Sequence, residues 1–273
     1  MVGNSPRESA AIARRPGAWQ PRARIAVSFC LVLVLGVGAW AVVNGRREAR
    51  LVRADPDGAA ADSRSMKFAV PRGREIFEQR CAACHGHNGE GSSTLGSANL
   101  TDQDWLYGEG TPGDIETVIM YGIRAPNSKT WHLADMPAFA LEQPYPREPA
   151  IKPLSPGGID DVIQFLRTVE GRSADENAAR RGSKVYVTAG CFDCHGTHAA
   201  GDNAIGAPNL VDGIWLFGDG SNTWIYDSIA HGRAGVCPAW SGRLSAVKIR
   251  EVALYVYSLS HSPGIYQPKA SLR

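Results

Sequence analysis

The sequence predicts an all-α protein in which two small helical domains of related sequence follow one membrane-spanning helix. Three observations support this fold class. An uncharged apolar run lies near the N-terminus, the motif Cys-x-x-Cys-His occurs twice, and the landmarks around the first motif recur around the second. The segments between these landmarks place apolar residues at helical spacing, and few of them have the composition of strands.

The apolar run covers residues 25–43, which is 19 residues without a charge and is near the length that crosses a bilayer. Five arginines precede it and four follow it, so charge bias alone orients it weakly. Ala39-Trp40-Ala41 resembles a signal-peptide cleavage site, but the run is long for a signal peptide, so a retained anchor is the favoured interpretation. We therefore expect an N-terminal segment over 1–24, an anchor over 25–43 and a polar linker over 44–68.

The charge of the chain argues against nucleic-acid binding. The whole chain has 29 basic and 27 acidic residues, for a net charge of +2. Residues 1–43 hold five of the basic and one of the acidic residues, so the remainder holds 24 basic and 26 acidic residues, or −2. Domains that bind nucleic acid usually carry a basic face, so we exclude that class.

Each Cys-x-x-Cys-His motif has the spacing of a c-type haem attachment site. Its two thiols lie one helical turn apart and can bond to the two vinyl groups of one haem, while the adjacent histidine lies under the iron. A zinc site, a disulfide or a redox dithiol could explain one such motif, but two copies in the same context favour two covalently bound haem c groups. The residues that would hold them are Cys81, Cys84 and His85 in the first motif and Cys191, Cys194 and His195 in the second.

These motifs also orient the anchor, because c-type haem is attached outside the cytoplasm. Residues 1–24 should then be cytoplasmic. The chain after about residue 44 should lie on the periplasmic side of a bacterial inner membrane.

The two motifs belong to a tandem duplication. The second begins 110 residues after the first (191 − 81), and Trp105-Leu106-Tyr107-Gly108 recurs at that offset as Trp215-Leu216-Phe217-Gly218. The offset falls to 101 (237 − 136) where Met136-Pro137-Ala138-Phe139 corresponds to Cys237-Pro238-Ala239-Trp240. The predicted boundaries are 69–170 for the first domain, 175–263 for the second and 264–273 for a C-terminal tail.

Both copies have the same predicted helices. One helix leads into the motif, a short one follows a polar, Gly-rich loop, and a third closes the copy. These helices cover 73–80, 111–121 and 159–169 in the first copy, and 177–189, 221–231 and 249–259 in the second. A copy of roughly 90–100 residues buries little apolar core alone, so the haem would supply much of the buried surface.

The first copy has a clear candidate for the second axial ligand of its iron. A Met thioether opposite the histidine gives a haem a relatively high potential. Met136 precedes a proline, which makes the loop that presents its sulfur rigid. Met120 is the competitor, but it lies in a predicted helix. We therefore expect His85 and Met136 to ligate the first iron.

The second copy breaks this pattern. Its residue equivalent to the Met ligand is Cys237, and it contains no Met. Three alternatives remain for the ligand opposite His195. Cys237 would bind as a thiolate and lower the potential, another group such as His231 would bind, or the sixth position would be open.

The landmarks of both copies resemble those of one family. They are Asn99-Leu100-Thr101-Asp102, Tyr121-Gly122-Ile123-Arg124 and Met136-Pro137-Ala138-Phe139 in the first copy, and Gly206-Ala207-Pro208-Asn209-Leu210 and Tyr255-Val256-Tyr257-Ser258-Leu259 in the second. On these landmarks the chain resembles the diheme subunit III (CcoP/FixP) of cbb-type haem–copper cytochrome c oxidases. The resemblance implies two class I cytochrome c domains and a membrane anchor. It also implies redox partner proteins, including the oxidase catalytic subunit and a monohaem cytochrome subunit.

Two features depart from that family. Cys237 stands where the family has Met, and residues 6–24 hold one aromatic residue, Trp19, where the family has an aromatic-rich stretch. These departures bear on assembly with an oxidase core rather than on haem attachment.

The leading functional hypothesis is a membrane-anchored diheme cytochrome that relays single electrons in a respiratory chain. No acid–base pair or activated nucleophile stands out in the sequence, so we expect no substrate turnover by this chain alone. Two alternatives start from the second haem. A haem with His/Cys ligation could oxidise a sulfur compound such as thiosulfate, and a haem with an open sixth position could bind or sense a gas.

Overall fold

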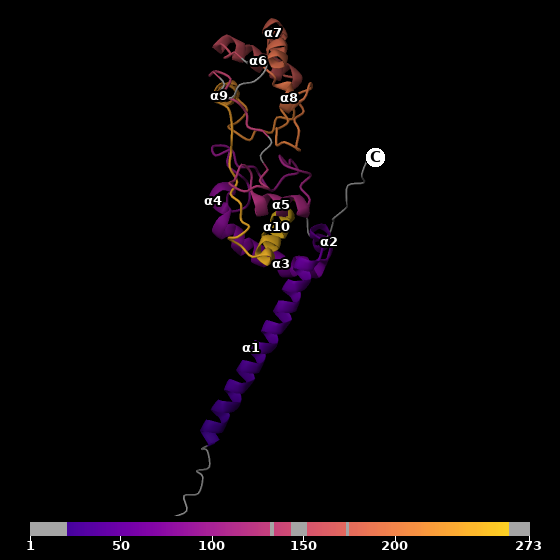
Figure 1. Ribbon diagram of the computed structural model, residues 1–273, viewed down its shortest axis with the longest axis vertical. Coiled ribbons are helices and arrows are strands. Elements are labelled where there is room, and N and C mark those ends of the chain that lie inside the picture. Colours follow the sequence, from indigo (N-terminus) through magenta and orange to yellow (C-terminus); the bar gives the residue numbers. More distant parts are fainter. Residues whose placement is uncertain (1–20, 132–133, 143–151, 173–174, 262–273) are drawn as a thin grey trace, which may run out of the picture. The chain divides into compact units, whose positions relative to one another are not determined.

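The computed structural model describes residues 21–131, 134–142, 152–172 and 175–261 (Figure 1). The described residues form helices and loops without β-strands, which confirms the predicted all-α class. The predicted tail over 264–273 lies outside them. The helices are α1 (Pro21–Arg53), α2 (Pro56–Ala61), α3 (Ser63–Arg80), α4 (Ala82–His85), α5 (Pro112–Tyr121), α6 (Pro156–Val169), α7 (Glu176–Thr188), α8 (Phe192–His195), α9 (Asn222–His231) and α10 (Ala246–Ser260).

Helix α1 contains the apolar run. Its stretch Ser28–Arg53 is long and apolar enough to cross a membrane, and no other helix of the described residues is. The large apolar side chains from Phe29 to Val43 are exposed, as lipid-facing side chains would be. The chain divides into two compact units, residues 1–46 and residues 47–273, and the remaining helices belong to the second unit.

The segment expected as a polar linker, residues 44–68, is instead largely helical. Helix α1 runs through its first part, and the carboxylates of Asp55 and Asp62 then accept hydrogen bonds from the first free backbone N–H groups of α2 and α3. Leu51 is 1% exposed and packs in a cluster with Leu254 of α10. The segment is therefore held by burial of its apolar residues as well as by helix capping.

The helix that closes the second copy packs on the first copy. Val252 and Val256 of α10 share an apolar cluster with Phe77 of α3 and Ile115 of α5. The rings of Phe77 and Tyr255 lie 5.3 Å apart between centroids. In Figure 1 the yellow helix α10 accordingly lies beside α3 and α5.

The helix that closes the first copy packs on the second copy in the same way. Ile159 and Ile163 of α6 share a cluster with Tyr186 of α7 and Ile225 of α9. The rings of Phe165 and Tyr186 lie 5.0 Å apart between centroids. Figure 1 shows α6 lying beside α7.

The two closing helices are thus exchanged between the copies. We call α3, α4, α5 and α10 the first lobe, and α6, α7, α8 and α9 the second lobe. Every predicted helix is present, but each lobe takes its closing helix from the other copy. The predicted boundaries 69–170 and 175–263 therefore describe the duplication of the sequence and not the packing units of the fold.

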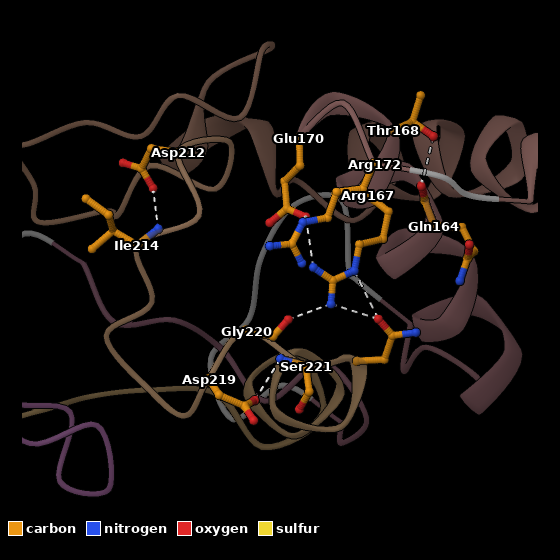
Figure 2. Close-up of polar contacts among 11 residues, drawn as sticks. Gln164, Arg167, Thr168, Glu170, Arg172, Asp212, Ile214, Asp219, Gly220 and Ser221 are labelled. Carbon is orange, nitrogen blue, oxygen red and sulfur yellow. Dashed lines mark hydrogen bonds and ion pairs between the residues drawn. The ribbon is translucent and has the colours of Figure 1, made fainter.

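A buried arginine fastens α6 to the second lobe (Figure 2). The Arg167 guanidinium donates to Oε2 of Glu170 at 2.8 Å, to Oδ1 of Asn222 at 3.0 Å and to the carbonyl of Gly220. Glu170 is 2% exposed in its side chain, and Arg172 contributes a second cation at 3.5 Å. These bonds join α6 to the start of α9.

A second buried arginine fastens α10 to the first lobe. Arg250 pairs with Glu116 of α5 and donates to the carbonyls of Leu51 at 2.8 Å and Ala54 at 2.9 Å. These carbonyls lie at the C-terminal end of α1, so Arg250 also satisfies backbone groups that the end of a helix leaves free.

Glu251, next to this arginine, should make stability depend on pH. Burial raises its pKa to about 7, and Arg72 at 3.7 Å only partly offsets that effect. Between the unfolded pKa of about 4.5 and the folded pKa, the folded state binds a proton that the unfolded state has lost, so the free energy of unfolding should fall as pH rises through this window.

The free energy of unfolding of the unmodified chain should fall by on the order of 1–3 kcal/mol between about pH 5 and about pH 8. In Glu251→Gln this fall should be absent. Thermal unfolding at both pH values measures this effect. Glu176→Gln is the matched control because its side chain is 88% exposed. Equal pH dependence in Glu251→Gln and in the unmodified chain would contradict the assignment.

Candidate haem-binding sites

Both Cys-x-x-Cys-His motifs fold in the same way. A helix of the lobe leads into each motif, and the motif itself forms a single helical turn, α4 or α8. Nδ1 of His85 hydrogen-bonds the carbonyl of Ala98 at 3.0 Å, and Nδ1 of His195 hydrogen-bonds the carbonyl of Pro208 at 3.0 Å. A carbonyl only accepts, so Nδ1 carries the proton and Nε2 of each ring keeps a lone pair for a metal.

The electrostatics of the motifs suit the same role. Burial lowers the pKa of His85 and of His195, and the hydrogen bond to the carbonyl only partly offsets this. Both imidazoles are therefore neutral, as metal ligands must be. Burial also raises the pKa of Cys81 and of Cys191 to about 12, so these half-buried thiols are protonated rather than present as reactive thiolates.

One continuous cavity of about 560 Å³ is lined by both motifs. Three buried polar groups that line it, Nε1 of Trp105, Nε1 of Trp215 and the hydroxyl of Tyr107, have no hydrogen-bond partner within the described residues. An unsatisfied buried donor costs on the order of 1–3 kcal/mol, so a ligand that brings acceptors into this cavity fits it. The propionate carboxylates of haem are acceptors of this kind, and the apolar walls suit its macrocycle.

The structure places Cys237 in the first lobe. Its backbone exchanges two hydrogen bonds with Ile123, at 2.9 and 3.0 Å, just after α5. Its side chain lines the cavity that both motifs share, and it is near enough to Cys81 of the first motif to affect the pKa of that thiol. Burial raises its pKa to about 11, with a further contribution from the nearby Cys84. Cys237 therefore lies with His85 and not with the histidine of its own copy.

Met136 lies in the second lobe. Its backbone exchanges two hydrogen bonds with Arg233, at 3.0 and 3.1 Å, just after α9. Its side chain packs against the apolar cluster of that lobe, which Cys191 and Trp215 also contact. Met136, which we expected opposite His85, and Cys237, one of the three alternatives opposite His195, therefore each lie in the lobe that holds the motif of the other copy.

The reason for this exchange is that each of these residues belongs to the segment that precedes a closing helix. The chain passes from the first lobe to the second before Met136, and α6 then packs in the second lobe. It returns to the first lobe before Cys237, and α10 then packs in the first lobe.

His231, the other candidate ligand, is exposed and pairs with Asp227 at 2.8 Å.

One arginine, which we did not predict as a site residue, links the segment before Met136 to the segment before Cys237. Arg124 has a left-handed backbone (φ 49), which is uncommon for a residue with a side chain. Its Nε donates to the carbonyl of Gly235 at 2.6 Å and its Nη1 donates to that of Ala134 at 3.0 Å. It therefore touches the segment before Cys237 and the segment before Met136 at once. Its only signal in the sequence was its place in the repeat.

The loops behind the two motifs also interlock. The backbone N–H of Gly108 donates to the carbonyl of Asn203 at 3.1 Å, and that of Gly218 donates to the carbonyl of Ser93 at 3.0 Å. The aromatic residue that precedes each of these glycines covers a glycine of the opposite copy, Tyr107 over Gly206 and Phe217 over Gly96, where any side chain would overlap the ring. These contacts hold the two sites next to each other.

Comparison with known proteins places these features in one group. The family model described as "Cytochrome C oxidase, cbb3-type, subunit III" matches residues 68–148 and 177–256, once in each copy. The CcoP subunit of a cbb3-type cytochrome c oxidase from Rhodobacter capsulatus is 40% identical over 234 residues, which cover 82% of this chain and 73% of the relative. The FixP subunit from Bradyrhizobium sp. is 36% identical over 218 residues, 80% of this chain and 70% of the relative. The CcoP subunit from Cereibacter sphaeroides is 32% identical and covers 82% and 72%.

Proposed function

Since the chain belongs to the cbb3-type cytochrome c oxidase subunit III family, we propose that it carries two haem c groups and passes single electrons between them toward the catalytic subunit of a cbb3-type oxidase. It is a membrane-anchored c-type cytochrome of the electron-transfer kind. The relatives favour this function over the oxidation of a sulfur compound and over gas sensing, because the curated proteins quoted above are oxidase subunits.

The proposed attachment sites follow the two motifs. Cys81, Cys84 and His85 would hold one haem, and Cys191, Cys194 and His195 would hold the other. Met136 would also bind the iron of the haem in the second lobe. Haem iron, when bound, supplies the one-electron couple between its ferrous and ferric states.

The residues of this chain would position the haem groups, donate hydrogen bonds to them and exclude water. The carbonyls of Ala98 and Pro208 fix the ring orientation of the two histidines and make their Nε2 atoms better donors. The indole N–H groups of Trp105 and Trp215 would donate to propionates, and the apolar cavity wall would exclude water. A site that excludes water and is already ordered rearranges its atoms little when an electron arrives or leaves, which favours electron transfer.

The observation that carries the proposal is the continuous cavity, lined by both motifs and by unpartnered donors. It supports two macrocycles held near each other by the interlocked loops, so that an electron could move between them within one chain. A single haem would leave one of the two equivalent indole groups unsatisfied.

The orientation and the partners follow from the same proposal. Covalent haem attachment outside the cytoplasm would put both lobes on the periplasmic side of a bacterial inner membrane, with residues 1–24 in the cytoplasm. The partners would be the catalytic subunit and the monohaem cytochrome subunit of the oxidase.

Purification of the native protein in detergent tests this function. We expect two haem c per chain, and oxidase subunits that co-purify with it. The paired substitution Cys81→Ala with Cys84→Ala should lose one haem, and Cys191→Ala with Cys194→Ala should lose the other. One haem or none in the unmodified chain would reject the two-site proposal, and a chain that purifies with two haems but without oxidase subunits would reject the assembly.

A further inference from the structure

We infer that Cys237 is the sixth ligand of the iron in the first lobe, opposite His85, so that the chain combines one His/Cys haem with one His/Met haem. This inference rests on the proposed function, because it requires haem at the first motif. It goes beyond the family resemblance, in which Met occupies this position.

The first support is the equivalence of two backbone positions. Gly122, which ends α5, lies against the carbonyl of Cys237, and Gly232, which ends α9, lies against the carbonyl of Met136. Both glycines have left-handed backbones, with φ of 74 and 72, and a side chain at either would overlap the facing carbonyl. Each lobe therefore presents a sulfur-bearing residue from the same place in its architecture.

The second support is the surroundings of the thiol. Cys237 lines the cavity together with His85, and it is close enough to Cys81 and Cys84 to influence their electrostatics. Tyr107, which is nine-tenths buried with an unpartnered hydroxyl, lines the same cavity. The thiol is thus one of several groups that face a common ligand.

Ligation by this group is simple in its chemistry. Sγ of Cys237 would give its proton to solvent and donate a lone pair to the iron, which forms one Fe–S bond and leaves the oxidation state of iron unchanged. Among the described residues the Cys237 thiol makes one long contact, to the carbonyl of Pro238 at 3.9 Å, and the positive charge of the iron would offset the cost of deprotonating a buried thiol.

The consequence is a difference between the two haems. A thiolate pushes electron density onto iron, whereas a thioether with histidine raises the potential. The haem in the first lobe should therefore have the lower potential, and an electron on this chain should rest mainly on the haem held by His195 and Met136.

Low-temperature electron paramagnetic resonance of the oxidised full chain, purified in detergent, tests the ligation. We expect two low-spin ferric species, one of which has the signature of thiolate ligation. Cys237→Ala should lose that signature, and Cys237→Met should replace it by a second species of the His/Met kind with a higher potential in a redox titration. Cys30→Ala is the matched control, because it removes the other cysteine outside the motifs and should change neither species.

A second pair of variants identifies the lobe. Cys81→Ala with Cys84→Ala should remove the thiolate species, and Cys191→Ala with Cys194→Ala should keep it. Where a paired variant does not accumulate, Cys237→Met in the full chain still decides the ligation. A chain with two haems and no thiolate species would overturn this inference and leave the proposed function standing, whereas fewer than two haems would overturn the proposed function itself.

Discussion

Replacing Arg167 by methionine is expected to lower the free energy of unfolding of the second lobe by about 3–5 kcal/mol. The substitution keeps most of the side-chain volume but removes the cation that holds the buried carboxylate of Glu170 (Figure 2). Arg172 remains near this carboxylate, but at 3.5 Å and half-exposed it replaces only part of the lost interaction. The bonds to Gly220 and Asn222 at the start of α9 would be lost as well.

Denaturant unfolding of the purified chain measures this loss. Arg180→Met is the matched control, because Arg180 forms an exposed pair with Glu176 and should change stability by less than about 0.5 kcal/mol. Adding Glu170→Gln to Arg167→Met should recover part of the loss, since the uncompensated charge is then gone. A loss below about 1 kcal/mol in Arg167→Met would contradict the role given to this arginine.

Gly182→Ala is the second substitution with a large expected effect. Alanine is normally the better helix residue by about 1 kcal/mol. At this position in α7, however, a Cβ would overlap the backbone carbonyl of Asp161 in α6. The two helices must move apart to make room, so we expect a net destabilisation of about 1–3 kcal/mol.

The matched control for this change is Gly157→Ala. Gly157 lies in the first turn of α6, and a methyl group added there would meet nothing within 4 Å outside its own stretch of helix. Alanine at this position should therefore be neutral or stabilising by about 0.5–1 kcal/mol. Chemical denaturation compares both variants. A Gly182→Ala chain as stable as Gly157→Ala would show that α6 and α7 do not approach closely.

The helices and the proximal residues could be predicted from the sequence because their signals are local. Each helix shows its apolar face in its own spacing, and the Cys-x-x-Cys-His motif holds within one helical turn the two thiols and the histidine that the proposal assigns to haem. Caps such as Ser155 before α6 and Ser245 before α10 are equally local. Nothing outside a short window is needed to interpret them.

The exchange between the copies could not be predicted in this way. Phe165 of α6 and Tyr255 of α10 occupy the same repeat position, and each packs on an aromatic ring of a helix that leads into a motif, Tyr186 or Phe77, so either aromatic pairing would bury similar surface. A local apolar pattern says that a helix must be covered but not which of two similar partners covers it. The change of offset between Gly108 and Met136 marked where the copies diverge but did not indicate that the chain crosses there.

The helical course of residues 44–68 was hidden for a related reason. This segment is polar overall, and its stability comes from a few apolar side chains, such as Leu51, which meet a helix almost two hundred residues later in the sequence. The role of Tyr107 was hidden because an unpartnered hydroxyl becomes visible only when the surrounding fold is known.

Crosslinking of paired cysteines tests the exchange most directly. Arg181 of α7 donates to the carboxylate of Asp161 in α6 at 2.8 and 2.6 Å, whereas Glu251 of α10 is the residue that occupies the same repeat position as Asp161. In a Cys30→Ala background, Arg181→Cys with Asp161→Cys and Arg181→Cys with Glu251→Cys should be treated with a short thiol crosslinker and analysed by mass spectrometry. The exchanged fold predicts a crosslink in the first pair and none in the second. A crosslink between positions 181 and 251, with none between 181 and 161, would contradict it.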